Sequence, residues 1–131
     1  ETNTFNANAV SQAEYGTENF VYDMNYNSAK IAKEAVKEYL EENQSNIRFV
    51  AGAMGPTSKT LSMSTKVEDP GYRDLSFSEM MNAYYDQVRG LIDGGADIIL
   101  IETITDTLNA KSAIFAVQKY FSEIQMLSHL L

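Results

Sequence analysis

The fold of this chain is decided by the stretch Gly94-Gly95-Ala96-Asp97-Ile98-Ile99-Leu100-Ile101-Glu102-Thr103, in which four consecutive apolar residues end on a carboxylate. A strand that is covered on both faces has a continuous apolar run rather than an alternating one. In parallel α/β folds, the groups that contact ligands lie at the carboxyl ends of the strands. The stretch therefore predicts a buried parallel strand over residues 97–102 that delivers Glu102 to a site, although structural ion pairs also use acids at such positions.

The composition indicates one globular domain. The 131 residues are 44% hydrophobic and 21% charged, and they include no cysteine, so there is no disulfide framework and no thiolate for a metal or a nucleophile. The formal net charge of −8 disfavours nucleic acid and anionic membranes as partners. No apolar run approaches the roughly 20 residues of a membrane span, and no signal-peptide pattern is present, so we expect a cytoplasmic protein.

The start of the sequence has the pattern of an interrupted strand. Glu1 is not a methionine, and Glu1-Thr2-Asn3-Thr4-Phe5 is typical of the end of a strand whose beginning is missing. We therefore expect this chain to be a fragment of a longer protein.

The first half of the chain alternates between helical and strand patterns. Apolar residues recur at helical spacing from Ile31 to Leu40, with charged residues between them, which predicts an amphipathic helix. Asn43 to Asn46 interrupt this pattern. Residues 47–51 then predict a short strand, and residues 52–56 predict the loop that follows it.

The second half repeats the alternation. A second helix begins at Ser76, whose spacing from Glu79 is that of a capping box, and Gly94-Gly95 permits the backbone conformation that ends it. The strand over residues 97–102 follows at once. A third helix then begins at a cap provided by Thr105, Asp106 or Thr107; all three remain candidates for the cap.

This order of strands and helices predicts a parallel sheet with right-handed crossovers. An open doubly wound sheet and a (βα)8 barrel both fit, but no Gly-x-Gly-x-x-Gly follows a strand, which weakens the dinucleotide-binding alternative. As a barrel, the chain would supply about half of a domain that usually needs about 250 residues, with unsealed edges. We predict that residues 1–5, 47–53 and 97–102 are adjacent parallel strands with helices on one outer side.

Polar or turn-forming residues lie at the carboxyl ends of all three predicted strands, and these ends should meet on one rim. Asn3 and Thr4 lie in the first, Gly55 and Pro56 follow the second, and Glu102 ends the third. Glycine lets backbone N–H groups approach a ligand closely, and proline stiffens the turn. A tight turn, or side chains that satisfy loop backbone, would explain the same residues without a ligand.

Four stretches of the chain closely resemble the homocysteine-binding domain of the cobalamin-dependent methionine synthases. The resemblance covers nearly everything from residue 1 to about residue 119 with its spacing intact, whereas residues 124–131 diverge from the family pattern. The matching stretches are Glu1-Thr2-Asn3-Thr4-Phe5-Asn6, Arg48-Phe49-Val50-Ala51-Gly52-Ala53-Met54-Gly55-Pro56-Thr57-Ser58-Lys59-Thr60, Asp69-Pro70-Gly71-Tyr72-Arg73, and residues 90–111, which include Ile101-Glu102-Thr103-Ile104-Thr105-Asp106-Thr107-Leu108-Asn109-Ala110-Lys111.

The resemblance implies a (βα)8 barrel that binds homocysteine at its rim, holds the thiolate on zinc, and takes a methyl group from methylcobalamin to give methionine. Folate and cobalamin domains of the longer protein are the implied partners, because methyltetrahydrofolate regenerates the cobalamin there. In this family the acid that ends the fourth strand helps hold the substrate's amino group, which implies that role for Glu102. Asn3, Thr4, Gly55 and Pro56 would shape the rest of the pocket.

The chain departs from the family in its metal ligands. The family's zinc is held by three cysteine thiolates beyond the region matched here, and this chain has none. His129 is the sole histidine, and one histidine without partners is not a metal site. We therefore expect neither zinc nor cobalamin on this chain, no catalytic residue within it, and no activity from it alone.

Two other functions remain open. One is a different homocysteine S-methyltransferase, with betaine or S-methylmethionine as the methyl donor; residues 55–60 and 106–111 favour the cobalamin-dependent branch instead. The other is a truncated, non-catalytic binding module that retains part of the pocket. Downstream sequence with paired cysteines would distinguish these alternatives.

Overall fold

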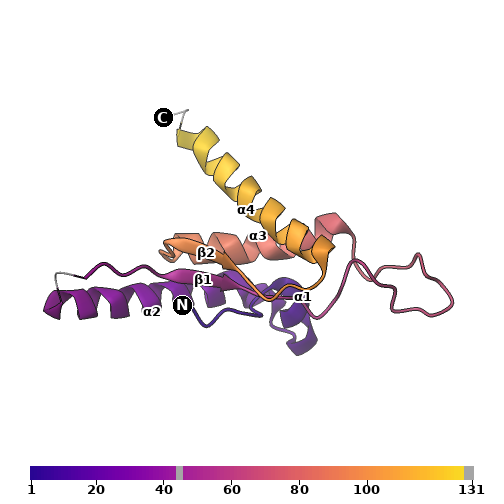
Figure 1. Cartoon of the computed structure of the whole chain (residues 1–131), viewed down its shortest axis with the longest axis horizontal. Coiled ribbons are helices and arrows are strands. Elements are labelled where there is room, and N and C mark those ends of the chain that lie inside the picture. Colours follow the sequence, from indigo (N-terminus) through magenta and orange to yellow (C-terminus); the bar gives the residue numbers. More distant parts are fainter. Residues whose placement is uncertain (44–45, 129–131) are drawn as a thin grey trace.

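The computed structural model describes residues 1–43 and 46–128, in which helices pack along a small parallel sheet (Figure 1). Two short 3-10 turns, η1 and η2, lie between the first two helices. The elements in chain order are α1 (Ala9–Gln12), η1 (Ala13–Tyr15), η2 (Glu18–Phe20), α2 (Val21–Glu42), β1 (Ala51–Met54), α3 (Phe77–Asp93), β2 (Ile98–Ile101) and α4 (Thr107–Ser128).

The two strands confirm the predicted parallel pairing. β1 and β2 run side by side with Ala51 opposite Ile98 and Met54 opposite Ile101, and α3 makes the crossover between them. The predicted bounds of the first of these strands are wrong, because β1 begins at Ala51 and Gly52 lies within it rather than in the loop. A strand needs a partner, and β2 begins only at Ile98, after the turn at residues 94–95.

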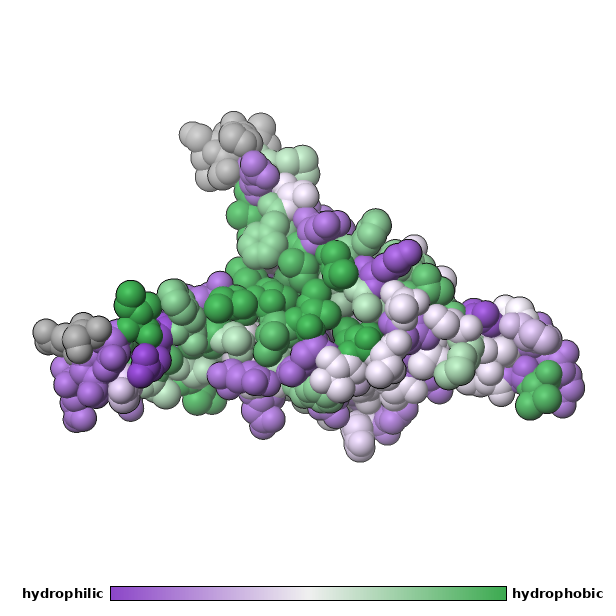
Figure 2. Space-filling model, in the orientation of Figure 1, coloured by the Kyte–Doolittle hydropathy of each residue, from purple (hydrophilic) through white to green (hydrophobic). Residues whose placement is uncertain are grey.

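The expectation that β2 is covered on both faces is also wrong. Side chains alternate along a strand, and one set, which includes Ile99 and Ile101, packs against the core. Ile98 belongs to the other set and is 49% exposed. Helices cover one face of this sheet only, and the opposite face carries an apolar surface; Figure 2 shows hydrophobic side chains gathered over the sheet between α4 and α2.

Residues 1–5 are not a strand, contrary to the prediction, although they run along the edge of β1. The backbone N–H of Thr2 donates to the Ala51 carbonyl at 2.9 Å, and the N–H of Gly55 donates to the Phe5 carbonyl at 2.8 Å. Between these two bonds, threonine hydroxyls take the place of backbone groups, so no regular ladder forms.

Helix α2 begins at Val21, ten residues before the predicted start at Ile31. The sequence pattern did not indicate residues 21–30 as helical, because polar residues among them mask the apolar periodicity. This half of α2 is held by close packing on α3: a Cβ added at Gly94 would lie 2.3 Å from the Tyr26 carbonyl oxygen. In the second half, the predicted apolar stripe is only partly covered, and Ile31 is 65% exposed.

Helices α3 and α4 begin with the caps that the sequence indicated. The Ser76 side chain accepts from the Glu79 N–H, and Glu79 accepts from the Ser76 N–H, which confirms the capping box. Asp106 is the cap of α4, because its carboxylate accepts from the Leu108 and Asn109 N–H groups. In the described part of the chain, no helix is long and apolar enough to cross a membrane.

Candidate functional site

Glu102 lies at the carboxyl end of β2, where its N–H donates to the Met54 carbonyl at 3.0 Å. The register of the strands places its side chain in the same alternating set as Ile98, on the face that the helices leave uncovered. Thr103, the next residue, has a φ of 57°, which is unusual for a β-branched side chain. Strained backbone of this kind is found disproportionately at functional sites.

The carboxyl group of Glu102 is poised for a cation. Its Oε1 atom is buried and has no hydrogen-bond partner among the described residues. Desolvation, the negative charge of Glu1 and a side-chain hydrogen bond with Glu1 together raise the pKa of Glu102. A positive group placed against these two acids would favour the ionised form and relieve their repulsion.

Glu1 is the site residue that our sequence reasoning missed. We interpreted it only as the start of an interrupted strand, but it interacts with Glu102. No sequence pattern signalled this role, because residues 1–4 are all polar; in the structure these residues alternate, with Thr2 and Thr4 buried and Glu1 and Asn3 exposed. The residues of one set share a side of the segment, so the same alternation places Asn3 with Glu1.

Two of the predicted pocket residues support the rim from inside the molecule. Thr4 is 1% exposed, and its hydroxyl donates to the Ala53 carbonyl at 2.8 Å. Gly55 uses its N–H on Phe5 and accepts from the Tyr84 hydroxyl at 3.0 Å. A Cβ at Gly55 would lie 2.6 Å from the Phe5 carbonyl oxygen, so the close approach that requires glycine here is that of residues 1–5.

Pro56 begins a rim loop that is attached to α1 and α4. Its carbonyl accepts from the Asn8 side chain at 3.4 Å. Farther along the loop, the buried Asn109 side chain accepts from the Leu61 N–H at 3.1 Å and donates to the Lys59 carbonyl at 2.8 Å. Two of the stretches that carry the family resemblance therefore contact each other directly.

Asp106 strengthens this attachment. It accepts from both the N–H and the hydroxyl of Ser62 at 2.9 Å, in addition to the N–H groups at the start of α4. Desolvation acts to raise the pKa of Asp106, but the hydrogen bonds from Asn109, Ser62 and Leu108 outweigh it and lower the pKa. Asp106 thus remains ionised as a structural group at the rim.

Arg73 organises the remainder of the long loop after β1. Its guanidinium donates to the carbonyls of Leu61 at 2.6 Å, Tyr72 at 2.6 Å, Pro70 at 2.8 Å and Ser62 at 3.3 Å. One side chain therefore joins two parts of the loop, and Arg73 has a structural role here.

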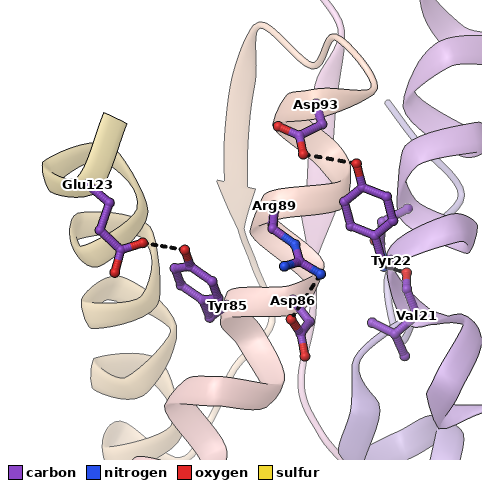
Figure 3. Close-up of polar contacts among 8 residues, drawn as sticks. Val21, Tyr22, Tyr85, Asp86, Arg89, Asp93 and Glu123 are labelled. Atoms are coloured by element: carbon purple, nitrogen blue, oxygen red, sulfur yellow. Dashed lines mark hydrogen bonds and ion pairs between the residues drawn. The ribbon is translucent and has the colours of Figure 1, made fainter. Parts of the chain in front are cut away.

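A second polar cluster lies among the helices rather than on the uncovered face (Figure 3). Asp93 of α3 accepts from Tyr22 of α2 at 2.9 Å and from Tyr120 of α4 at 2.6 Å, and Tyr85 donates to Glu123. Burial and the Asp93 carboxylate raise the pKa of Tyr120. These protonated tyrosines join α2, α3 and α4 into one layer.

The residues present do not fit a zinc site. The sequence has no cysteine. Within residues 1–43 and 46–128, no group of three or more histidine, cysteine, aspartate or glutamate side chains is arranged to hold a metal ion. His129 lies outside the described residues.

Comparison with known proteins agrees with this architecture. The family model for homocysteine S-methyltransferase matches residues 1–130, so the chain belongs to the homocysteine S-methyltransferase family. Its structure is similar to the crystal structure of the homocysteine methyltransferase MmuM from Escherichia coli, oxidized form, with a TM-score of 0.68 and 23% sequence identity. The match covers 91% of this chain and 41% of that chain. The chain therefore has an α/β fold that matches part of a TIM-barrel-like fold, and it spans less than half of the relative's length.

Proposed function

We propose that this chain is the substrate-binding part of a longer homocysteine methyltransferase and that Glu102 binds the ammonium group of homocysteine. The observation that carries this proposal is the buried, unpartnered Oε1 of Glu102 beside a second acid, Glu1. A partly desolvated carboxylate favours a cationic partner, and the substrate's amino group supplies one. Membership of the family supports homocysteine as the molecule that carries it.

The other rim residues complete this pocket. Asn3 is exposed on the same side of its segment as Glu1 and contacts the substrate. Thr4, Gly55 and Pro56 shape the pocket by holding residues 1–5 and the loop after β1 in place. The carboxylate pair therefore selects the amino end of the substrate.

The methyl donor that we propose is methylcobalamin, regenerated from methyltetrahydrofolate on other domains of a cytoplasmic methionine synthase. The contacts of Thr57 and Lys59 with Asn109 support this branch, because both stretches resemble it. Zinc ligands would come from the remainder of the longer protein, since this chain contains no cysteine. A betaine- or S-methylmethionine-dependent enzyme, and a binding module without chemistry, are the alternatives.

The test is homocysteine binding by the full-length protein with Glu102→Gln. The substitution keeps the size of the side chain and removes its charge, so we expect the dissociation constant for homocysteine to rise roughly tenfold to a hundredfold. Asp97→Asn is the matched control, because it removes an acid at the opposite end of β2, where Asp97 pairs with Lys33. If the folded Glu102→Gln protein binds homocysteine with unchanged affinity, Glu102 has only a structural role.

A further inference from the structure

The segment of residues 1–5 begins beside β1 as a parallel strand would. The Thr2 N–H donates to the Ala51 carbonyl at 2.9 Å. In a regular parallel ladder, the N–H of Ala53 would then donate to the backbone carbonyl of Thr2. Here it donates instead to the Thr2 hydroxyl at 3.0 Å. The hydroxyl thus takes the place of a backbone acceptor and holds the two backbones apart.

The register then slips by one residue. A regular ladder would next pair the Gly55 N–H with the Thr4 carbonyl, but Gly55 donates to the Phe5 carbonyl at 2.8 Å. The Thr4 carbonyl is left without a strand partner. It accepts instead from the Ala7 N–H at 3.0 Å and from the side chain of Gln87, on α3, at 2.7 Å.

Gln87 is an unusual residue type for a fully buried helix position. It is 0% exposed among the core residues of α3, and its Oε1 atom has no hydrogen-bond partner within the described residues. A buried amide with an unpaired oxygen lowers stability relative to an apolar side chain of the same size. An apolar residue could not donate hydrogen bonds here. The amide N–H groups of Gln87 donate to the carbonyl of Thr4 and, at 3.3 Å, to that of Ala53.

We propose that Gln87 is a positioning residue for the candidate site. By holding the Thr4 carbonyl, it keeps residues 1–5 beside β1 in the observed register, with Thr2 and Thr4 buried and with Glu1 and Asn3 exposed on the rim with Glu102. A one-residue change of register turns side chains to the opposite face of a strand, so the register decides which residues face the substrate. The link to homocysteine rests on the proposed function, whereas the register does not.

The register is tested by nuclear magnetic resonance on the 131-residue chain. In the native chain, we expect the scalar coupling across the Gly55 hydrogen bond to reach the carbonyl carbon of Phe5. In Gln87→Met, which keeps the length and removes the donor, this coupling should move to Thr4 or disappear. A native coupling from Gly55 to Thr4, or a Phe5 coupling that persists in Gln87→Met, would overturn the proposal.

Two further variants separate positioning from loss of stability. Val88→Ala shortens a neighbouring core side chain on α3, and we expect it to retain the Phe5 coupling. If Gln87→Met does not fold, Gln87→Asn replaces it, because the shorter amide cannot reach Thr4 in the same way. Loss of the Phe5 coupling in Val88→Ala as well would show that the register follows stability alone and would contradict the proposal.

The functional consequence is measured in the full-length protein. We expect Gln87→Met to raise the KM for homocysteine about tenfold while kcat at saturation changes little, because the substrate site is displaced and the reacting groups are not. Val88→Ala should leave KM unchanged. Equal changes of KM in both variants would refute a positioning role. If the native protein binds no homocysteine, the proposed function fails, and the coupling measurement still decides the register.

Discussion

At the scale of single residues, the site depends on one carboxyl oxygen of Glu102 that the described residues do not satisfy. Most buried polar groups in proteins have partners. The Oε1 atom of Glu102 has none in the described part of the chain, and the nearby Glu1 raises the pKa of Glu102 further, after desolvation. Such an arrangement costs stability in the free protein and favours binding of a cation.

The first prediction follows from the sign of this pKa shift. A carboxyl group whose pKa is raised on folding contributes stability below its ordinary pKa and loses that contribution as the pH rises through the raised value. We therefore expect Glu102→Gln to raise the Tm of the chain at neutral pH, and this gain should vanish as the pH falls below the ordinary glutamate range. Thermal unfolding followed by circular dichroism at several pH values measures both effects.

Glu34→Gln is the control for this prediction. Glu34 is exposed on α2, so its substitution removes the same formal charge away from the site. A Tm gain of equal size in Glu34→Gln would assign the effect to the net charge of −8 rather than to Glu102.

At the scale of elements, α2 and α3 pack closely because Gly90 and Gly94, at their interface, have no side chain. A Cβ at Gly90 would lie 2.6 Å from the Tyr22 carbonyl oxygen, and one at Gly94 would lie 2.3 Å from that of Tyr26. These are backbone atoms, so no side chain can rotate to give space. The packing therefore requires glycine, and it orders the polar first half of α2.

The second prediction concerns Gly94→Ala. Because α2 must move away from α3, we expect the free energy of unfolding to fall by about 1–3 kcal/mol, the usual range for an overpacked interface. Gly71→Ala is the control: the nearest atom to its Cβ would be an Asp69 side-chain oxygen at 3.5 Å, an ordinary contact. Urea unfolding compares the two, and equal stability of both variants would show that the interface accommodates the methyl group.

At the scale of the whole molecule, the helices cover one face of the sheet and leave the other exposed, as Figures 1 and 2 show. Ile98 is 49% exposed and Phe49 is 64% exposed. Glu102 lies on this uncovered face, so the proposed substrate site is open on one side within this chain. The chain spans 41% of the MmuM homocysteine methyltransferase chain that it resembles, and we propose that further elements of a longer protein complete the site.

The third prediction concerns the metal content of the purified chain. The sequence has no thiolate, and the described residues offer no cluster of three suitable side chains. We expect no stoichiometric zinc to remain after dialysis against a chelator, as measured by atomic emission. About one zinc per chain surviving this treatment would reveal a site that neither the sequence nor the described residues indicate.

The sequence by itself determined the order of the elements from α2 onward, the parallel pairing of β1 and β2, the capping box of α3 and the placement of Glu102 at a strand end. These features depend on local patterns: apolar runs, capping residues and glycine pairs act within a few positions of one another. The family resemblance was also available from the sequence, because several separate stretches agree in residue and spacing.

Only the tertiary structure decided the features that need partners distant in sequence. Whether residues 1–5 form a strand depended on the hydroxyls of Thr2 and Thr4 and on Gln87, 83 positions away from Thr4. The role of Glu1 required the fold to bring it to Glu102. Local patterns state what a segment prefers, whereas hydrogen bonds and burial depend on which distant group arrives beside it.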